Sequence, residues 1–168
     1  IVVHVDDYVG LSLDELSRAA SEASRVYADI GVRLRWTVDD ASPEAVSQSD
    51  LHVRVLMLRK DMAERMIVAE GRGTSVLARA VPEALRAYIF YDRVVNVSAQ
   101  HTQSLGPFLG RVCAHELGHL FVGHRHWPTG LMGPTVNPGT AALGFTGEQG
   151  AVIRANIVAR LAESLSRH

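Results

Sequence analysis

Hydrophobic residues along the chain follow an alternating period in some stretches and a helical period in others. Alternating or β-branched runs predict five strands, at residues 1–5, 32–38, 51–57, 74–81 and 86–94. Apolar residues three or four positions apart predict helices at residues 12–30, from about 104 to 122, and from 146 onward. The charged stretch 59–70 has room for a further short helix after Asp61. The predicted order is strand, helix, four strands, helix, irregular loop and helix.

Signals for helix ends support these boundaries. Residues 12–15 and 146–149 each have the spacing of a capping box, in which a Ser or Thr and a Glu or Gln satisfy the first backbone N–H groups. Gly31 follows the first helix. Gly123 directly follows the middle helix and suits a left-handed C-terminal cap.

Composition limits the class of protein. The 168 residues are 47% hydrophobic and 21% charged, which fits a single domain, and the net charge of −1 gives no support for a nucleic-acid partner. No apolar run approaches the roughly 20 residues of a membrane span. Cys113 has no second cysteine to pair with and is expected to pack as a small apolar residue. We expect a monomer, and if a leader preceded Ile1, a secreted or periplasmic location is favoured.

The middle helix contains His115, Glu116 and His119 in the order His-Glu-x-x-His. Residues four apart share one helix face with Cβ atoms about 6 Å apart, so both imidazoles can bind one zinc ion at roughly 2.1 Å. Glu116 is one step round the helix, where its carboxylate can take a proton from water at the metal. The alternative is a pair of surface histidines. The helix is apolar nearly all round, however, and buried polar groups are costly unless a partner such as zinc satisfies them.

A third ligand is needed, because a catalytic zinc ion usually has three protein ligands and one open position. His124 and His126 both lie within reach once Gly123 reverses the chain. His126 has two more residues in which to swing back over the helix face. We therefore predict that His115, His119 and His126 bind one zinc ion and that His124 faces solvent. If both later histidines bound the metal, the site would be closed and structural.

Residues 115–132 resemble the motif of the metzincin clan of zinc endopeptidases. That motif is His-Glu-x-x-His-x-x-Gly-x-x-His, followed by a methionine-containing turn under the metal. The match is partial, because the glycine comes one place late, at Gly123, and histidines lie five and seven places after His119 instead of six. Gly123 and His126 keep the clan's mutual spacing. Residues 126–132 resemble the third ligand leading into the Met-turn.

The resemblance implies an α+β catalytic domain spanning residues 1–168. Its upper part, about residues 1–123, would be a twisted mixed sheet of four to five strands packed on two long helices. Its lower part, about residues 124–168, would contain the Met-turn and a final helix, with Met132 beneath the histidines unless it is an ordinary core residue. The clan also has an antiparallel edge strand that pairs with extended substrate. In this chain its position corresponds to residues 74–81 and includes Thr74, Ser75, Val76, Leu77 and Ala78.

We therefore expect a zinc-dependent endopeptidase that hydrolyses peptide or protein substrates with zinc-activated water and with Glu116 as general base. Two alternatives remain open, a zinc hydrolase of a non-protein amide, such as a cell-wall cross-link, and a zinc-stabilised binding module with little turnover. Glu116 favours catalysis, because a structural site has no need of a base. No tyrosine follows Met132, so the tyrosine with which some metzincins assist the oxyanion is absent or replaced.

Overall fold

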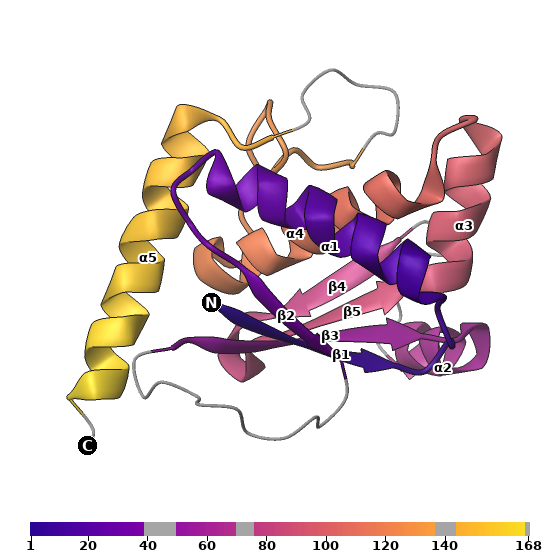
Figure 1. The fold of residues 1–168 in the computed structure, drawn as a ribbon, viewed down its shortest axis with the longest axis horizontal. Helices are drawn as coiled ribbons and strands as arrows, with labels where there is room; N and C mark the ends of the chain where they lie inside the picture. Colours follow the sequence, from indigo (N-terminus) through magenta and orange to yellow (C-terminus); the bar gives the residue numbers. More distant parts are fainter. Residues whose placement is uncertain (39–49, 70–75, 137–143, 167–168) are drawn as a thin grey trace.

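The computed structural model describes residues 1–38, 50–69, 76–136 and 144–166 (Figure 1). Its elements, in chain order, are β1 (Val2–Asp7), α1 (Leu13–Ala28), β2 (Arg35–Val38), β3 (His52–Leu58), α2 (Lys60–Ala69), β4 (Ala78–Val81), the 3₁₀ helix η1 (Pro82–Ala84), β5 (Arg86–Phe90), α3 (Tyr91–Gln100), α4 (Leu105–Val122) and α5 (Gly147–Leu165). No helix within these ranges is both long enough and apolar enough to cross a membrane.

The strands form one mixed sheet in the order β2-β1-β3-β5-β4. The pairings β1–β2, β1–β3 and β3–β5 are parallel, and β4 runs antiparallel to β5. Within the described residues, β4 and β2 are the two edge strands. The mixed sheet of four to five strands expected from the sequence is therefore confirmed.

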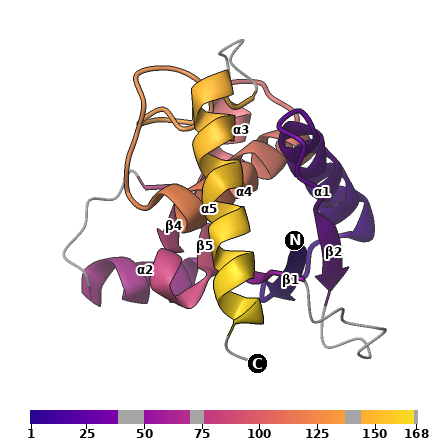
Figure 2. The same cartoon turned by 90° about the vertical axis from the view of Figure 1, so that its left-hand side faces the viewer.

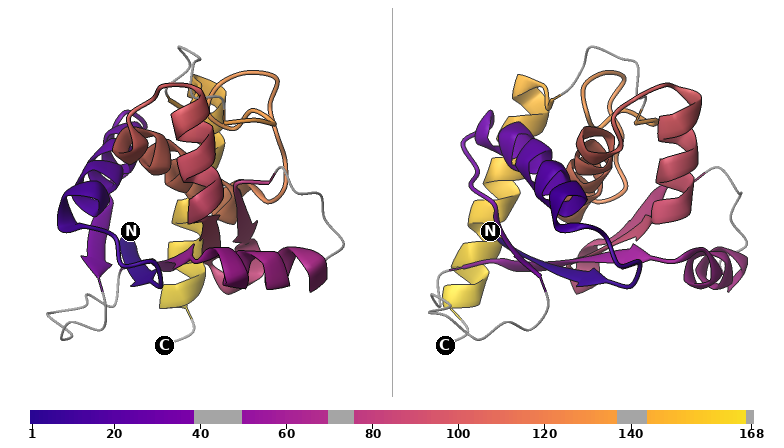
Figure 3. Two further views of the ribbon diagram at one scale, coloured as in Figure 1. Left: turned by 90° about the vertical axis from the view of Figure 1, so that its right-hand side faces the viewer. Right: turned by 45° about the vertical axis from the view of Figure 1, so that its right-hand side comes forward.

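Two long helices, α1 and α4, cover one face of the sheet (Figures 1 and 3). Strand alternation turns one set of side chains toward these helices and into the core: Val3, Val5, Val53, Val55, Met57, Ala87 and Ile89. The helices themselves come very close at Gly110, where an added Cβ would lie 2.4 Å from the carbonyl oxygen of Ala19. The core thus holds α4 rigidly between α1 and the sheet.

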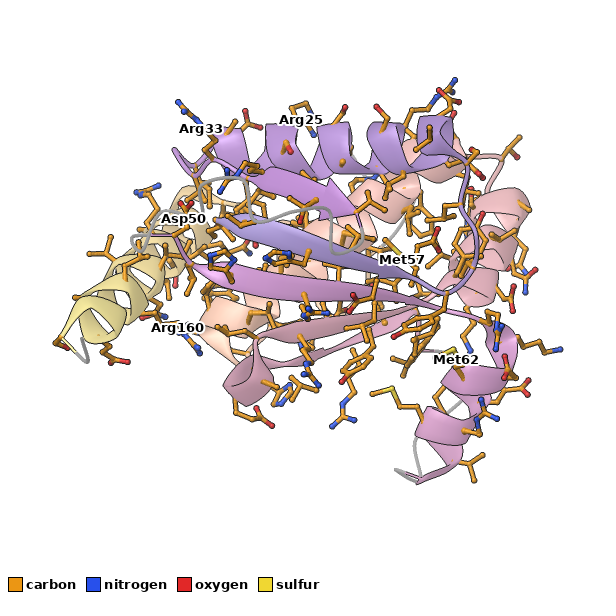
Figure 4. The ribbon with its side chains drawn as sticks, turned by 60° about the horizontal axis from the view of Figure 1, so that its bottom comes forward. Arg25, Arg33, Asp50, Met57, Met62 and Arg160 are labelled. Atoms are coloured by element: carbon orange, nitrogen blue, oxygen red, sulfur yellow. The ribbon has the colours of Figure 1, made fainter. Side chains whose placement is uncertain are left out.

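The opposite face of the sheet is covered at one end by α2. Leu58, Ala63, Ile67 and Phe90 form a second apolar cluster there, with Met62 packed against it. Figure 4, which brings this face forward, shows Met62 on α2 beyond the strands. The short helix expected after Asp61 is thereby confirmed, although it begins at Lys60.

Helix α5 lies at the end of the molecule where α4 terminates (Figure 2). The last carbonyls of a helix have no partner within it. Here Asn156 donates to the carbonyl of Phe121 at 2.8 Å, and Arg160 donates to that of Leu120 at 3.1 Å. Figure 4 shows Arg160 reaching from α5 toward this end. Helix α5 therefore caps the C-terminus of α4 through side chains.

Both predicted capping boxes are present. Ser12 accepts from the backbone of Glu15, and the Glu15 carboxylate accepts from the backbone of Ser12. Thr146 accepts from the Gln149 backbone at 3.2 Å, and the Gln149 side chain accepts from the Thr146 backbone at 3.1 Å. The starts of α1 and α5 follow from these pairs.

The predicted strand at residues 86–94 is wrong beyond Phe90. Residues 91–94 begin α3, a helix that the sequence pattern did not reveal. Val94 and Val95 favour extended backbone locally. Val94 and Ser98 are buried while Asn96 between them is exposed, which fits a helix, because on a strand all three side chains would share one face.

Two other strands are shorter than predicted. β2 begins at Arg35 instead of residue 32, and β4 begins at Ala78 instead of residue 74. Thr74 and Ser75 lie outside the described residues. Val76 and Leu77 precede the strand, although the Leu77 carbonyl still accepts from the Phe90 N–H at 2.9 Å.

Candidate metal centre

Helix α4 buries its polar residues together with its apolar ones. His115 and His119 are each 5% exposed and Glu116 is 7% exposed, between α1, the sheet and the loop after α4. The apolar residues predicted nearly all round this helix agree with its burial, since residues Phe108–Phe121 are all buried. These three polar side chains, like the buried Arg111 on the same helix, require polar partners.

Two of these partners are backbone carbonyls. His115 Nδ1 is 2.7 Å from the Leu131 carbonyl oxygen, and His119 Nδ1 is 2.7 Å from that of Gly123. A carbonyl only accepts, so each Nδ1 carries the proton and each Nε2 keeps its lone pair. The two Nε2 atoms lie 3.0 Å apart. Both histidines are thus held in the tautomer and orientation that metal-binding imidazoles adopt.

His126 completes a group of three. One ligand atom from each of His115, His119 and His126 lies within 4.8 Å of the others. The His126 ring is 5.6 Å from that of His115 and 4.7 Å from that of His119, measured between centroids. His124 lies farther out, with its ring 6.5 Å from that of His119, and is not in the group. Three histidine ligands leave one position of a tetrahedral ion open.

Burial shifts the protonation of the centre. It lowers the pKa of His115 and of His119 to about 4, because the charged imidazolium is poorly solvated there. It raises the pKa of Glu116 to about 8. The Glu116 carboxylate lies 4.0 Å from His115 Nε2. Near neutral pH the imidazoles are therefore in the neutral form that binds metals.

Gly123 ends α4 with φ of 68° and ψ of −154°, and its N–H donates to the His119 carbonyl at 2.9 Å. The positive φ agrees with the sequence prediction, but the ψ does not match a left-handed cap. This region of backbone conformation is almost restricted to glycine. It turns the Gly123 carbonyl back toward His119 Nδ1, so this residue couples the loop to the His119 ring.

Met132 is fully buried and packs against α4 at Gly118. An added Cβ at Gly118 would lie 2.5 Å from Met132 Sδ, so the glycine allows this close approach. The Met132 carbonyl accepts from the Trp127 N–H at 2.8 Å, which closes a loop that begins just after His126. Met132 thus lies beside the helix turn that carries His119.

A cavity of about 610 Å³ opens beside the histidines and extends to β4. That volume is within the range of small-ligand sites. Its apolar lining includes Val76, Leu77, Ala78, Phe90, Val97 and Val112. Glu116 and all four histidines from His115 to His126 also line it. Of the predicted edge-strand residues, the three that are described therefore border the cavity.

Other parts of the site were not foreseen. No sequence feature marks the Leu131 carbonyl that orients His115, because every residue has a backbone carbonyl. His101 and Thr135 also line the cavity, but no sequence pattern had assigned either residue to the site. His52 lies outside it, with Nδ1 2.8 Å from His4 Nε2 on the face of the sheet away from α4.

No protein-family model and no curated protein matches the sequence. Among solved structures, the chain is similar to a zinc-dependent peptidase from Methanocorpusculum labreanum, with a TM-score of 0.57 and 14% identity over 90% of this chain and 99% of that one. It also aligns with a Thermotoga maritima protein solved in solution, with a TM-score of 0.46 and 12% identity over 99% of this chain and 93% of that one. The first similarity is one of fold.

Proposed function

We propose that the chain is a zinc-dependent endopeptidase whose zinc ion is held by His115, His119 and His126. The observation that carries the proposal is the group of three histidine nitrogens within 4.8 Å, beside a buried glutamate and an open cavity. The fold shared with a zinc-dependent peptidase adds support by analogy.

The residues present fit a zinc ion. Two of the three imidazoles donate Nδ1–H to carbonyls, an outer-shell arrangement that orients Nε2 toward a metal. The third, His126, is exposed at the mouth of the cavity, from which an ion can enter. His124 lies outside the group, which argues against a closed structural site with four histidines.

A zinc ion bound there supplies Lewis acidity for a substrate carbonyl and for water. Glu116 takes a proton from the attacking water as its oxygen adds to the carbonyl carbon. The same carboxyl then delivers the proton to the leaving nitrogen as the C–N bond breaks. Burial disfavours the ionised carboxylate, but a neighbouring dication favours it, so Glu116 can act as a base when the metal is present.

In this proposal, substrate pairs with β4, which is an edge strand of the sheet among the described residues. This strand is hydrogen-bonded to β5 on one side, and its residues border the cavity. Backbone pairing along an edge gives affinity for extended peptides.

In a Glu116→Gln variant, a bound peptide should slow amide hydrogen exchange in Ala78–Val81. The other edge strand, Arg35–Val38, is the control and should not change. Slowed exchange in β2 alone would contradict this role of β4.

The proposal is tested by cleavage of a peptide library with and without a chelator. We expect cleavage by the zinc-loaded protein, loss on chelation and recovery when zinc is restored. Glu116→Gln should keep the metal and the fold but lose about 10²- to 10⁴-fold in rate, as is typical of general-base removal. A folded, zinc-loaded Glu116→Gln variant that cleaves at the wild-type rate would refute the role of Glu116.

Two other outcomes would replace the peptidase proposal. Hydrolysis of a cell-wall cross-link without any peptide cleavage would indicate a hydrolase of non-protein amides. Zinc binding without hydrolysis of either kind of substrate would indicate a binding module.

A further inference from the structure

Gln149 has more contacts than a helix cap requires. It is fully buried in the first turn of α5. Its Oε1 accepts from the Thr146 N–H, which is the expected capping contact, and lies 3.4 Å from the Met132 N–H. Its Nε2 donates to the Thr129 carbonyl at 2.5 Å. One side chain therefore joins the start of α5 to both ends of residues 129–132.

The turn is shaped to receive this amide. Gly130 has φ of 75°, and an added Cβ there would lie 2.6 Å from Gln149 Oε1 and 2.8 Å from its Nε2. A residue with a side chain would be strained at this φ and would also displace the amide. Gly130 thus permits the Gln149 amide to lie directly against the turn backbone.

Among the residues of a capping box, glutamine satisfies this arrangement without having to take up a proton. The cap itself needs an acceptor, which glutamate provides as well as glutamine. The Thr129 carbonyl needs a donor at the same time, and an ionised glutamate has none. The reverse orientation of the amide would place its NH₂ against two N–H donors. The chemistry of the three partners therefore selects an amide in one orientation.

The clamped turn contains the carbonyl that orients a metal ligand. Leu131 lies between the two clamped positions, and its oxygen is 2.7 Å from His115 Nδ1. If this carbonyl moves, the hydrogen bond from His115 Nδ1 is broken or redirected, and the ring can rotate. Such a rotation also turns His115 Nε2, which faces the site. Figures 1 and 2 show this loop, in orange, beside the first turn of α5.

We infer that Gln149 is a positioning residue, which fixes the Leu131 carbonyl and thereby holds His115 Nε2 toward the metal. The expected effect on zinc affinity rests on the proposed zinc site. The expected effect on the His115 ring is measured in metal-free protein and does not depend on that site. Helix α5, far from His115 in sequence, would then be part of the metal centre.

The test uses Gln149→Met, which keeps the size of the side chain and removes both polar atoms. Thr146→Ala is the matched control, because it removes the Thr146 hydroxyl from the cap and leaves the Gln149 amide in place. Gln149→Glu, studied at a pH at which the introduced carboxyl is ionised, is a second variant that keeps the cap acceptor and loses the donor. Two quantities are measured for each: zinc affinity by competition with a chelating dye, and solvent exchange of the His115 Nδ1–H in metal-free protein by NMR.

Gln149→Met should weaken zinc binding about 10- to 100-fold, the usual effect of losing an outer-shell partner, and should speed Nδ1–H exchange about tenfold or more. Thr146→Ala should change both less than about threefold, and Gln149→Glu should follow Gln149→Met. If Gln149→Met does not fold, Gln149→Glu decides by the same criteria. Unchanged exchange in the folded Gln149 variant would overturn the inference. If wild type binds no zinc, the proposed function fails, and the exchange measurement still decides the role of Gln149.

Discussion

Two histidines of the candidate centre are oriented by a hydrogen bond of the ring nitrogen that faces away from the site. His115 and His119 each place Nδ1 on a carbonyl, and His126 joins them from the loop. The spacing of His115, Glu116 and His119 was readable from the sequence, because four residues make one turn of a helix. The carbonyls of Leu131 and Gly123 were not, because their positions depend on how the loop folds.

The choice between His126 and His124 can be tested directly. His126→Ala should weaken zinc binding by at least about 10- to 100-fold, because even an outer-shell partner has an effect of that size. His124→Ala should leave most of the affinity, since its ring lies outside the group of three. A zinc titration of both variants decides between them. Loss of zinc by the His124 variant, with retention by the His126 variant, would reverse the assignment.

Glu116 should make the stability of the metal-free protein depend on pH. Burial raises its pKa from the ordinary value of 4.5 to about 8 on folding. Between these two values the folded protein holds a proton that the unfolded chain has lost. Stability is therefore greatest at the lower pH and declines by up to about 1.4 kcal/mol per pH unit as the pH rises toward 8.

Urea unfolding of chelator-treated protein at pH 6.5 and 7.5 measures this effect. Glu116→Gln is the control, because it keeps the size of the side chain and cannot ionise. The difference between wild type and variant isolates the contribution of Glu116 from those of His115 and His119, whose pKa values are lowered by folding. A pH dependence that is the same in both proteins would contradict the shifted pKa.

At the level of elements, the sequence predicted most helices and strands but missed α3. Helices α1 and α5 carry capping boxes, and α4 carries its apolar pattern, so their starts were predictable. α3 follows β5 with no intervening residue, so no turn signal separates them. Its helical conformation depends on packing against α4, a contact distant from the local pattern.

The contact between α4 and the loop gives a prediction at Gly118. Gly118→Ala would place a Cβ 2.5 Å from Met132 Sδ. We expect a loss of about 1–3 kcal/mol in the free energy of unfolding, as for other overpacked cores. Gly147→Ala is the control at the start of α5, where an added Cβ meets nothing within 4 Å, and it should cost nothing.

A double-mutant cycle identifies the cause of that loss. If Met132 is the obstacle, Gly118→Ala should cost much less in a Met132→Ala background, because the space is then free. Urea denaturation of the four proteins measures the coupling. An equal cost in both backgrounds would show that Met132 does not limit the space at Gly118.

At the scale of the whole molecule, the proposed metal site joins segments that are distant in sequence. His115 and His119 come from α4, while His126 comes from the loop that α5 secures through Gln149 and through Glu148, whose carboxylate accepts from Trp127 Nε1 at 3.0 Å. The mixed sheet was predictable from alternation and motif together. The contacts by which α5 holds this loop were not predictable, because a capping box indicates only the start of its own helix.

Zinc should therefore stabilise the entire fold. A ligand that binds only the folded state adds about 2.7 kcal/mol at a free concentration 100 times its Kd. Thermal unfolding should shift upward on addition of zinc and return on chelation. His126→Ala is the control and should respond only at much higher zinc concentration. A wild-type midpoint that does not respond to zinc would mean that the ion does not bind the folded protein tightly.

Zinc X-ray absorption of the metal-loaded protein can show whether His115, His119 and His126 form an open zinc site. We expect one zinc ion per chain with three imidazole nitrogens at roughly 2.0–2.1 Å and a fourth, non-protein oxygen ligand. His126→Ala should reduce the imidazole count to two. Four imidazoles around the ion would indicate a closed structural site, and a chain that takes up no zinc would refute the proposed metal site.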